Sequence, residues 1–385
     1  MNDRSGDMVQ IHMLTAYPAS LLNRDDVGLA KRIPFGGATR TRVSSQCLKK
    51  HWRESAPISH EGDAAVRSAR VYERLVAAPL ISEHGATEQE ATAIAKWLME
   101  QTVATKPVAK KSGIESAQSS QLLVLSKAET DFLYETAVRV LTDLRERAVE
   151  ITDEKAVAKE SQLEDARTLR QTLKALPASI DTSLFGRMVT SDLFARVDAA
   201  VSVAHAFTTH AEAAETDYFT AIDTLKTSQD DAGAGLIQDT ELTSGVYYLY
   251  AVIDMNQLRD NLIGFEASMA ESLGRSLVQA MATVTPSAKR GSTAPFSYAE
   301  FVMTERGAAQ PRSMANAFLD PVNGEGGRLM AASIERLLAH RARLATMYGD
   351  DGLEPVIATI HDLPTTDVAR RSFNELLGQT FRLGA

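Results

Sequence analysis

The stretch LLNRDDVGLAKRIPFGGATRTRVSSQCLKKHWR, residues 21–53, decides the fold of this chain. Pro34 and the pair Gly36-Gly37 mark a turn in its middle. Residues 38–43 then predict a short extended strand. The preceding residues 9–17, VQIHMLTAY, alternate apolar and polar side chains and predict a first strand. We therefore expect a strand, a polar loop, a short strand and then a helix.

The last part of this segment predicts a helix with a basic face. Ser44 and Ser45 are favoured N-cap residues, so we expect the helix to begin there and to run to about Ser55. Leu48 and Trp52 fall on one face and are expected to pack inward. A second face carries polar and basic side chains at the spacing i, i+3, i+4 and i+7, namely Gln46, Lys49, Lys50 and Arg53.

Positive charge is concentrated in the same segment. The whole chain has a net charge of −9, which by itself argues against a polyanionic partner. Residues 24–53, however, hold eight basic side chains against the carboxylates of Asp25 and Asp26, a local net charge of +6 that leaves −15 for the remainder. A basic stripe on an acidic body is typical of a nucleic-acid-binding surface. The eight are Arg24, Lys31, Arg32, Arg40, Arg42, Lys49, Lys50 and Arg53.

The segment has the groups that a single-stranded nucleic acid requires. Binding without sequence preference needs cations along the phosphates, together with hydroxyl and amide donors. Ser44 and Gln46 are the candidate donors. The cations that suit this role are Arg24, Lys31, Arg42, Lys49 and Arg53. The alternative is a basic face that is only solvated, and the charge cluster alone leaves both interpretations open.

Composition places the chain among soluble intracellular proteins. Its 385 residues are 44% hydrophobic and 24% charged, as in an ordinary globular protein. The single cysteine, Cys47, excludes an internal disulfide framework and fits a reducing compartment. We find neither a secretory signal nor an apolar run of about 18 residues, and we expect a cytoplasmic protein with no membrane contact.

The rest of the chain predicts an α+β fold. Residues 60–180 lack strand patterns and read as amphipathic helices. Sheet patterns return near 185–188 and in 197–209, a loop-rich stretch is expected at 211–244, and 245–254 is the clearest strand. A long helix at 256–283, a strand at about 298–304 and helices near 325–347 and 366–377 follow. This order is consistent with a split βαβ, ferredoxin-like core.

No pattern predicts a cofactor or a metal. His205 and His210 are five residues apart, which is a poor helical spacing for metal ligands, and no third ligand lies at a suitable distance. Gly36-Gly37 lacks the following Lys-Ser/Thr of a phosphate-binding loop. We predict no catalytic residue, no metal and no cofactor.

Several ordered motifs resemble one protein family. They are Ile11-His12, LNRDD at 22–26, Lys31, FGG at 35–37, RVSSQ at 42–46 and Leu48-Lys49, followed by GRMVTS at 186–191, residues 197–210, DYFTAIDTL at 217–225, SGVYYLYA at 244–251 and SMANAF at 313–318. This set resembles the CasC family, the backbone subunit of type I-E CRISPR Cascade. The likeness covers the first sixty residues and roughly 185–320, while 60–180 agrees in length and character only.

The resemblance implies a hand-shaped subunit and a set of partners. The palm is a ferredoxin-like domain, a modified RNA-recognition fold, formed by residues 1–59 and 182–385; the thumb is at about 208–244, and helical fingers occupy 60–181. Several copies stack along the guide RNA (crRNA) of an antiviral ribonucleoprotein complex. The implied partners are the crRNA, the target DNA strand through the guide, other copies of the chain, and the large, small, guide-5′-end and guide-3′-end Cascade subunits.

The resemblance also assigns roles to individual residues. Arg187 and Met188 are expected against the kinked guide, with Met188 as an apolar wedge. Tyr218 and Phe219 are expected in the thumb, stacked on or wedged against bases. The family commonly has a Trp-Phe pair at this position, so Tyr218 is a departure with a smaller ring.

Asp25 and Asp26 leave an enzymatic alternative open. Paired loop carboxylates can hold Mg²⁺ for phosphodiester cleavage, as in backbone subunits of the related type III complexes. The resemblance to type I-E implies no such activity, and the pair is then expected to orient Arg24 and to cap its loop. We therefore predict a non-catalytic chain, with a Mg²⁺-dependent ribonuclease as the alternative.

Overall fold

The computed structural model describes residues 6–102, 112–161, 166–187, 196–221, 236–324, 327–349, 352–363 and 368–382. The chain forms two compact units. The first, which we call the sheet unit, comprises residues 1–60, 201–256 and 268–385. The second, the helical unit, comprises residues 61–200 and 257–267. No described helix is long and apolar enough to cross a membrane.

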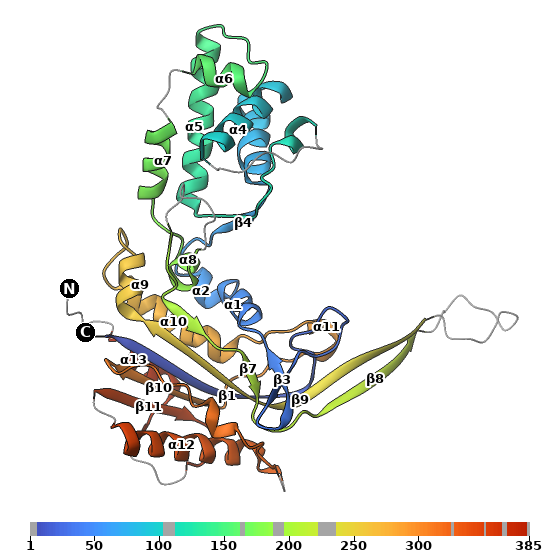
Figure 1. The fold of residues 1–385 in the computed structure, drawn as a ribbon, viewed down its shortest axis with the longest axis vertical. Coiled ribbons are helices and arrows are strands. Elements are labelled where there is room, and N and C mark those ends of the chain that lie inside the picture. The colour runs from blue at the N-terminus through green and yellow to red at the C-terminus, as the bar shows by residue number, and fades with distance from the viewer. Residues whose placement is uncertain are drawn as a thin grey trace, which may run out of the picture. The chain divides into compact units, whose positions relative to one another are not determined.

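The sheet unit combines one large sheet with helices on both of its faces (Figure 1). Its strands are β1 (Met8–Ser20), β2 (Arg32–Phe35), β3 (Ala38–Val43), β6 (Val201–Val203), β7 (Ala206–Thr208), β8 (Ala214–Ala221), β9 (Leu236–Asp254), β10 (Phe301–Gly307), β11 (Leu353–Thr359) and β12 (Ala369–Arg370). Its helices are α1 (Ser45–Arg53), α2 (Ala56–Ser59), α10 (Met269–Thr283), α11 (Arg290–Thr293), the 3₁₀ helix η3 (Ala315–Phe318), α12 (Leu329–Tyr348) and α13 (Phe373–Thr380).

The strand order confirms the predicted α+β class with a ferredoxin-like core. The sheet runs β12-β11-β10-β1-β9-β7-β3-β2, and β6 and β8 also pair with β9. Its central strands β10, β1, β9 and β7 are antiparallel neighbours. Helix α1 follows β1 and β3, and α10 connects β9 to β10. This is the βαββαβ arrangement that the order of elements along the sequence indicated.

Alternating side chains of β9 pack on different layers, as the pleat of a strand requires. Val246 and Tyr248 belong to a core that includes Leu337 of α12. Tyr247 and Leu249 instead line a small cavity together with Leu48 and Trp52 of α1 and Met281 of α10. Helices α1 and α10 therefore cover one face of the sheet and α12 covers the other.

Several expectations for the sheet unit were wrong. Within the expected loop-rich stretch 211–244, the described residues are mostly strand: β8 and β9 pair antiparallel, in register from Ala214 opposite Thr243 to Ala221 opposite Leu236, while residues 222–235 lie outside the described part. The helix expected at 256–283 is two helices, α9 (Met255–Asn261) and α10. Strand β11 was not anticipated. Of the sheet pattern expected near 185–188, the structure shows an isolated antiparallel bridge between Arg187 and Val197, in the helical unit. β8 and β11 exist because they pair with β9 and β10, and a short stretch of sequence does not show such pairing.

The helical unit has its own apolar core. Tyr72, Leu98 and Leu133 are fully buried in it. Its elements are β4 (Val66–Ser68), the π-helix η1 (Tyr72–Ala77), α3 (Ala78–His84), α4 (Glu88–Thr102), the 3₁₀ helix η2 (Gly113–Ser116), β5 (Leu123–Leu125), α5 (Lys127–Glu146), α6 (Glu154–Glu160), α7 (Ala166–Ala175) and α8 (Ile180–Phe185). The unit begins at residue 61 and extends to residue 200, so residues 182–200, assigned to the palm from sequence, lie in the helical unit.

Gly36 allows a close backbone approach in the sheet unit. It has φ +61, and a Cβ atom built on it would lie 1.5 Å from the carbonyl oxygen of Leu319. The neighbouring Gly37 has φ +74, but a Cβ atom there would meet nothing within 4 Å. Of these two glycines, Gly36 alone combines a left-handed backbone with a steric requirement for hydrogen.

Replacing each glycine with alanine separates these two effects. Both Gly36→Ala and Gly37→Ala should lose about 1–2 kcal/mol of unfolding free energy from the positive φ. Gly36→Ala should lose roughly 1–3 kcal/mol more, because Leu319 must move. Urea unfolding of the two variants measures the difference. Equal losses would contradict the close approach at Leu319.

Candidate nucleic-acid interface

The loop between β1 and β2 is closed by its own polar groups. Asp25 Oδ1 accepts hydrogen bonds from the backbone N–H groups of Val27 at 3.0 Å and Leu29 at 2.9 Å. The N–H of Asp25 donates to the carbonyl of Leu29 at 2.8 Å. Arg24 is exposed on this loop. Asp25 therefore shapes the loop that presents Arg24, in agreement with its expected capping role.

Asn23 joins this loop to the start of α1. Its side-chain oxygen accepts the N–H of Ser44 at 2.9 Å, and its carbonyl accepts the N–H of Lys31 at 2.9 Å. Ser44 is the N-cap of α1, and its hydroxyl accepts the N–H of Cys47 at 3.3 Å. The hydroxyl of Ser44 is largely buried, so its first function is to cap the helix. The sequence reasoning did not identify Asn23 as this connection.

Helix α1 carries the predicted basic face. Leu48 and Trp52 are buried, as expected from their spacing. Gln46 is exposed in the first turn, and Lys49 and Arg53 are half-buried. Loss of solvent around the ammonium group lowers the pKa of Lys49, which is the direction that desolvation imposes on a cation.

Several of the eight basic residues in the stripe are engaged within the protein. Arg40 is fully buried, and it donates to the carbonyls of Thr208 at 3.1 Å and Phe318 at 2.9 Å. Arg32 forms ion pairs with carboxylates. Lys50 pairs with Glu54 at 2.8 Å across one turn of α1. The local charge of +6 is therefore larger than the positive charge that a ligand can contact on this surface.

The remaining cations lie on the β1–β2 loop, β3 and α1. The side chain of Arg42 contacts His205 Nδ1 at 3.1 Å and donates from Nε to the carbonyl of Arg32 at 3.2 Å. Burial, and then the charges of Arg42 and Lys31, lower the pKa of His205. Lys31 also acts electrostatically on the thiol of Cys47, whose pKa is raised by burial. The loop is joined to the start of α1 through Asn23 and Ser44. We call the exposed or half-buried candidate contacts on the loop, β3 and α1 the basic surface, namely Arg24, Lys31, Arg42, Gln46, Lys49 and Arg53.

The β8–β9 hairpin holds the predicted aromatic pair. Tyr218 lies opposite Asp239 and is 64% exposed, so its ring is available for stacking. Phe219 lies opposite Gln238 in the register. Met188, the predicted wedge, lies outside the described residues.

Arg187 is engaged inside the helical unit. Its side chain is only 3% exposed and pairs with Glu129 of α5 at 2.6 Å. It also donates to the carbonyl of Val124 at 3.2 Å. Glu129 in turn accepts the N–H of Ser126 at 2.7 Å as part of a capping box. A buried guanidinium that completes this network has a structural role, and the contact of Arg187 with a guide stays a prediction.

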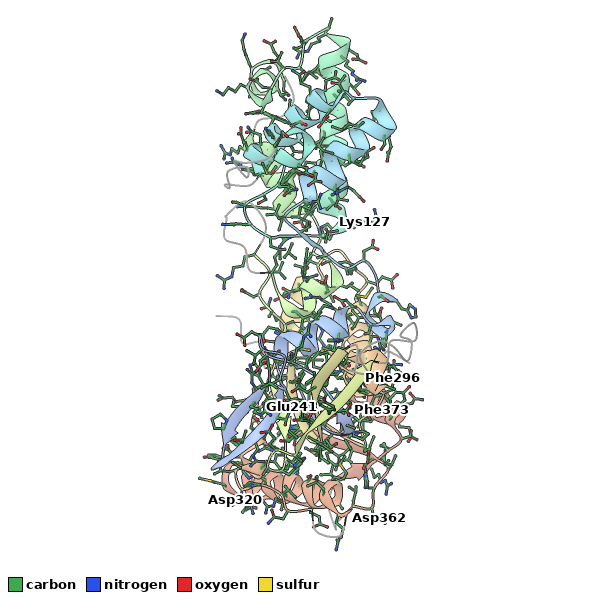
Figure 2. The ribbon with its side chains drawn as sticks, turned by 90° about the vertical axis from the view of Figure 1, so that its right-hand side faces the viewer. Lys127, Glu241, Phe296, Asp320, Asp362 and Phe373 are labelled. Atoms are coloured by element: carbon green, nitrogen blue, oxygen red, sulfur yellow. The ribbon has the colours of Figure 1, made fainter. Side chains whose placement is uncertain are left out.

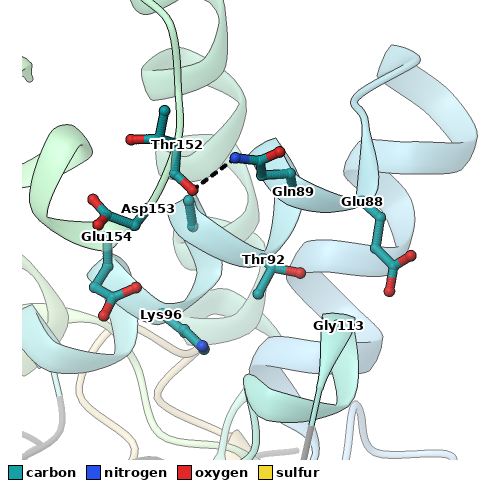
Figure 3. A pocket seen from close by; sticks show the side chains of 9 residues that line it. Glu88, Gln89, Thr92, Lys96, Gly113, Thr152, Asp153 and Glu154 are labelled. Carbon is teal, nitrogen blue, oxygen red and sulfur yellow. Dashed lines mark hydrogen bonds between the residues drawn. The ribbon is translucent and has the colours of Figure 1, made fainter.

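A concavity of about 490 Å³ in the helical unit is lined by none of the predicted site residues (Figure 3). Its charged lining residues are Glu88, Asp153, Glu154 and Lys96. Asp153 caps α6, and Glu88 accepts the N–H of Ile114 at 3.3 Å. The excess of carboxylates makes this concavity unsuited to phosphate. Among the described residues, no group of three or more His, Cys, Asp or Glu side chains has a geometry that could hold a metal ion.

Replacing Arg187 tests its structural role. Arg187→Met should lower the unfolding free energy by about 3–5 kcal/mol, because Glu129 would remain buried without its partner. The double variant Arg187→Met with Glu129→Leu should recover part of this loss. Thermal and urea unfolding check both values. A stable Arg187→Met variant with weakened RNA binding would favour the direct contact.

The comparisons with known proteins agree with this architecture. The model of the CT1975-like protein family matches residues 9–381. One solved chain, from a "CRISPR RNA-guided surveillance complex, pre-nicking", is 28% identical with a TM-score of 0.79 and covers 97% of this chain and 100% of its own. A chain from a "CRISPR RNA-guided surveillance complex" is 25% identical with a TM-score of 0.75 and covers 98% and 100%. A comparison with curated sequences found no significant match. Because the family model spans nearly the whole chain, the protein belongs to the CT1975-like family of CRISPR-associated proteins of the Cascade type.

Proposed function

We propose that the chain is the guide-RNA-binding backbone subunit of a type I-E Cascade complex, and that it catalyses no reaction itself. Several copies would line the crRNA, and the target DNA strand would be recognised through the guide. The other Cascade subunits would complete the complex in the cytoplasm. The two similar structures, which come from RNA-guided surveillance complexes, support this assignment.

The observation that carries the proposal is that the loop after β1, strand β3 and helix α1, which follow closely in the chain, each carry cations. The loop contributes Arg24 and Lys31, β3 contributes Arg42, and α1 contributes Lys49 and Arg53. A phosphate chain requires cations distributed along its length, and several elements can supply them. Binding of this kind is salt-sensitive and weakly dependent on sequence. With about 3–5 phosphates contacted per copy, the log–log salt slope is roughly −2 to −4 per subunit.

The β8–β9 hairpin has a separate task in this proposal. We assign Tyr218 and Phe219 to contacts with bases, where an aromatic ring can replace a stacking neighbour. Met188 keeps its assignment as an apolar wedge from the resemblance. Regular displacement of a nucleotide by each copy would divide the guide into segments, and the basic surface would hold the phosphates between them.

The local structure supports a non-catalytic role for Asp25. Its Oδ1 atom already accepts two backbone hydrogen bonds that close the loop. A catalytic Mg²⁺ site needs carboxylate oxygens directed at the ion, usually from more than one residue. Asp26 is exposed beside it. The ribonuclease alternative therefore rests on Asp26 and on the second carboxylate oxygen of Asp25.

Charge reversal on α1 tests RNA binding. Lys49→Glu with Arg53→Glu should prevent assembly on the guide, because two phosphate contacts become repulsive. The neutral pair Lys49→Gln with Arg53→Gln should make the salt slope less steep by about 1.4, at ~0.7 per phosphate. Native mass spectrometry measures the assembly, and filter binding across a salt series measures the slope.

A matched control lies on the opposite face of the sheet. Arg328→Glu with Arg343→Glu makes the same change in net charge at exposed positions at and within α12. This control should assemble normally. Full assembly of the α1 reversal, or equal failure of the control, would contradict the assignment of the α1 face.

Incubation with complementary RNA and Mg²⁺ tests the ribonuclease alternative. We expect no cleavage by the assembled complex. Regularly spaced cuts that disappear in Asp26→Ala would establish the alternative. Asp25→Ala should instead weaken guide binding, because the loop that carries Arg24 loses two hydrogen bonds of about 1 kcal/mol or more each.

A further inference from the structure

Three charged side chains meet where the β8–β9 hairpin leaves the sheet. Arg32 of β2 donates from Nε to Glu212 at 2.5 Å and from its Nη2 atom to Glu241 of β9. The side chains are 32%, 16% and 11% exposed for Arg32, Glu212 and Glu241 respectively. Partial burial reduces the solvent screening that weakens ion pairs on an open surface. Figure 2 labels Glu241 in this region.

Glu241 uses its two carboxylate oxygens for different partners. One oxygen, Oε1, accepts Arg32, and the other, Oε2, accepts the backbone N–H of Ala30 at 2.6 Å. Ala30 is buried and lies 211 residues away in the sequence, on the loop that follows β1. The single carboxylate therefore joins a strand of the hairpin to the loop and to β2.

The loop end of this connection lies beside the residues assigned to phosphate contacts. Ala30 precedes Lys31, and Arg42 donates to the carbonyl of Arg32 at 3.2 Å. The N–H of Arg42 donates to the carbonyl of Lys31 at 2.8 Å. Glu241 thus holds Ala30, which is adjacent in sequence to Lys31. It also holds Arg32, whose carbonyl accepts a hydrogen bond from Arg42. Lys31 and Arg42 are both predicted phosphate contacts.

The hairpin end of the connection lies beside the exposed aromatic residue. Glu241 is opposite Thr216 in the register, and Tyr218 is opposite Asp239, two residues further along. Thr240, next to Glu241, accepts a hydrogen bond from the ammonium of Lys289 on the α10–β10 connection. The base of the hairpin is therefore fixed from two sides by contacts to the sheet unit.

We propose that Glu241 is a positioning residue that sets the placement of the β8–β9 hairpin relative to the phosphate-binding loop, and so sets the spacing at which each copy displaces a nucleotide. This inference rests on the proposed function. Glu241 contacts no RNA in this scheme. It acts because one carboxylate holds two donors from the loop and β2 at a fixed point of β9.

The variant Glu241→Gln tests this directly. A neutral amide has one acceptor oxygen and directs an NH₂ group at the other donor, so it cannot satisfy both Ala30 and Arg32. The amide of Ala30 should then exchange hydrogen roughly tenfold faster, as expected on loss of a charge-assisted hydrogen bond. Hydrogen exchange of the isolated chain measures this without RNA.

The RNA readout is the pattern of chemically reactive nucleotides along an assembled guide. Wild-type complex should give regularly spaced reactive positions. Glu241→Gln should bind the guide with nearly unchanged affinity, because no phosphate contact is removed, but the regular spacing should be lost. Glu215→Gln is the matched control: it removes the same charge from an exposed position of β8 and should leave both exchange and spacing unchanged.

Other outcomes would overturn the inference. These are unchanged spacing in Glu241→Gln, the same loss in Glu215→Gln, or a folded Glu241→Gln chain that no longer binds guide. A wild-type chain that binds no guide would refute the proposed function instead, and the exchange of Ala30 would still decide whether Glu241 holds the loop.

Discussion

Strand β1 is hydrogen-bonded along both edges, and the rest of the sheet unit depends on this pairing. Residues 8–14 lie between β9 and β10, with Ile11 opposite both Ala251 and Thr304. A central strand has no free edge, so its position is determined by two ladders at once. The loop that carries Arg24 begins directly after β1. The location of the basic surface is therefore set by a strand that contributes no contact to it.

The buried charges beneath α12 explain why His12 belongs to the core. Burial lowers the pKa of His12, and its Nδ1 atom lies 2.9 Å from the hydroxyl of Tyr248. Glu305 of β10 is buried beside it and accepts Arg341 of α12 at 2.8 Å. Buried charges are tolerated only when they are paired in this way. The histidine of the family motif thus helps to join β1, β9, β10 and α12, away from the basic surface.

The positive charge that a ligand meets depends on where the basic residues lie in the sequence and on which of them folding buries. The net charge of −9 conceals the basic segment, but the segment itself divides on folding into two classes. Arg32 and Arg40 serve the protein, one in ion pairs at the base of the hairpin and one among buried carbonyls. Arg24, Lys31, Arg42, Lys49 and Arg53 keep exposed or half-buried side chains. A ligand meets only the second class, which is why a charge count overestimates the field at a binding surface.

The sequence by itself determined the elements that depend on neighbours along the chain. The strand at β1, the N-cap Ser44, the inward face of α1 and the α+β class follow from local periodicity and capping chemistry. Tertiary structure alone decided which arginines are buried, the pairing of β8 with β9 and the pairing of Glu241 with Ala30. These outcomes depend on contacts between residues far apart in sequence, and no local pattern in the chain reports them. Arg187 shows the same limit, since its partner Glu129 lies 58 residues away.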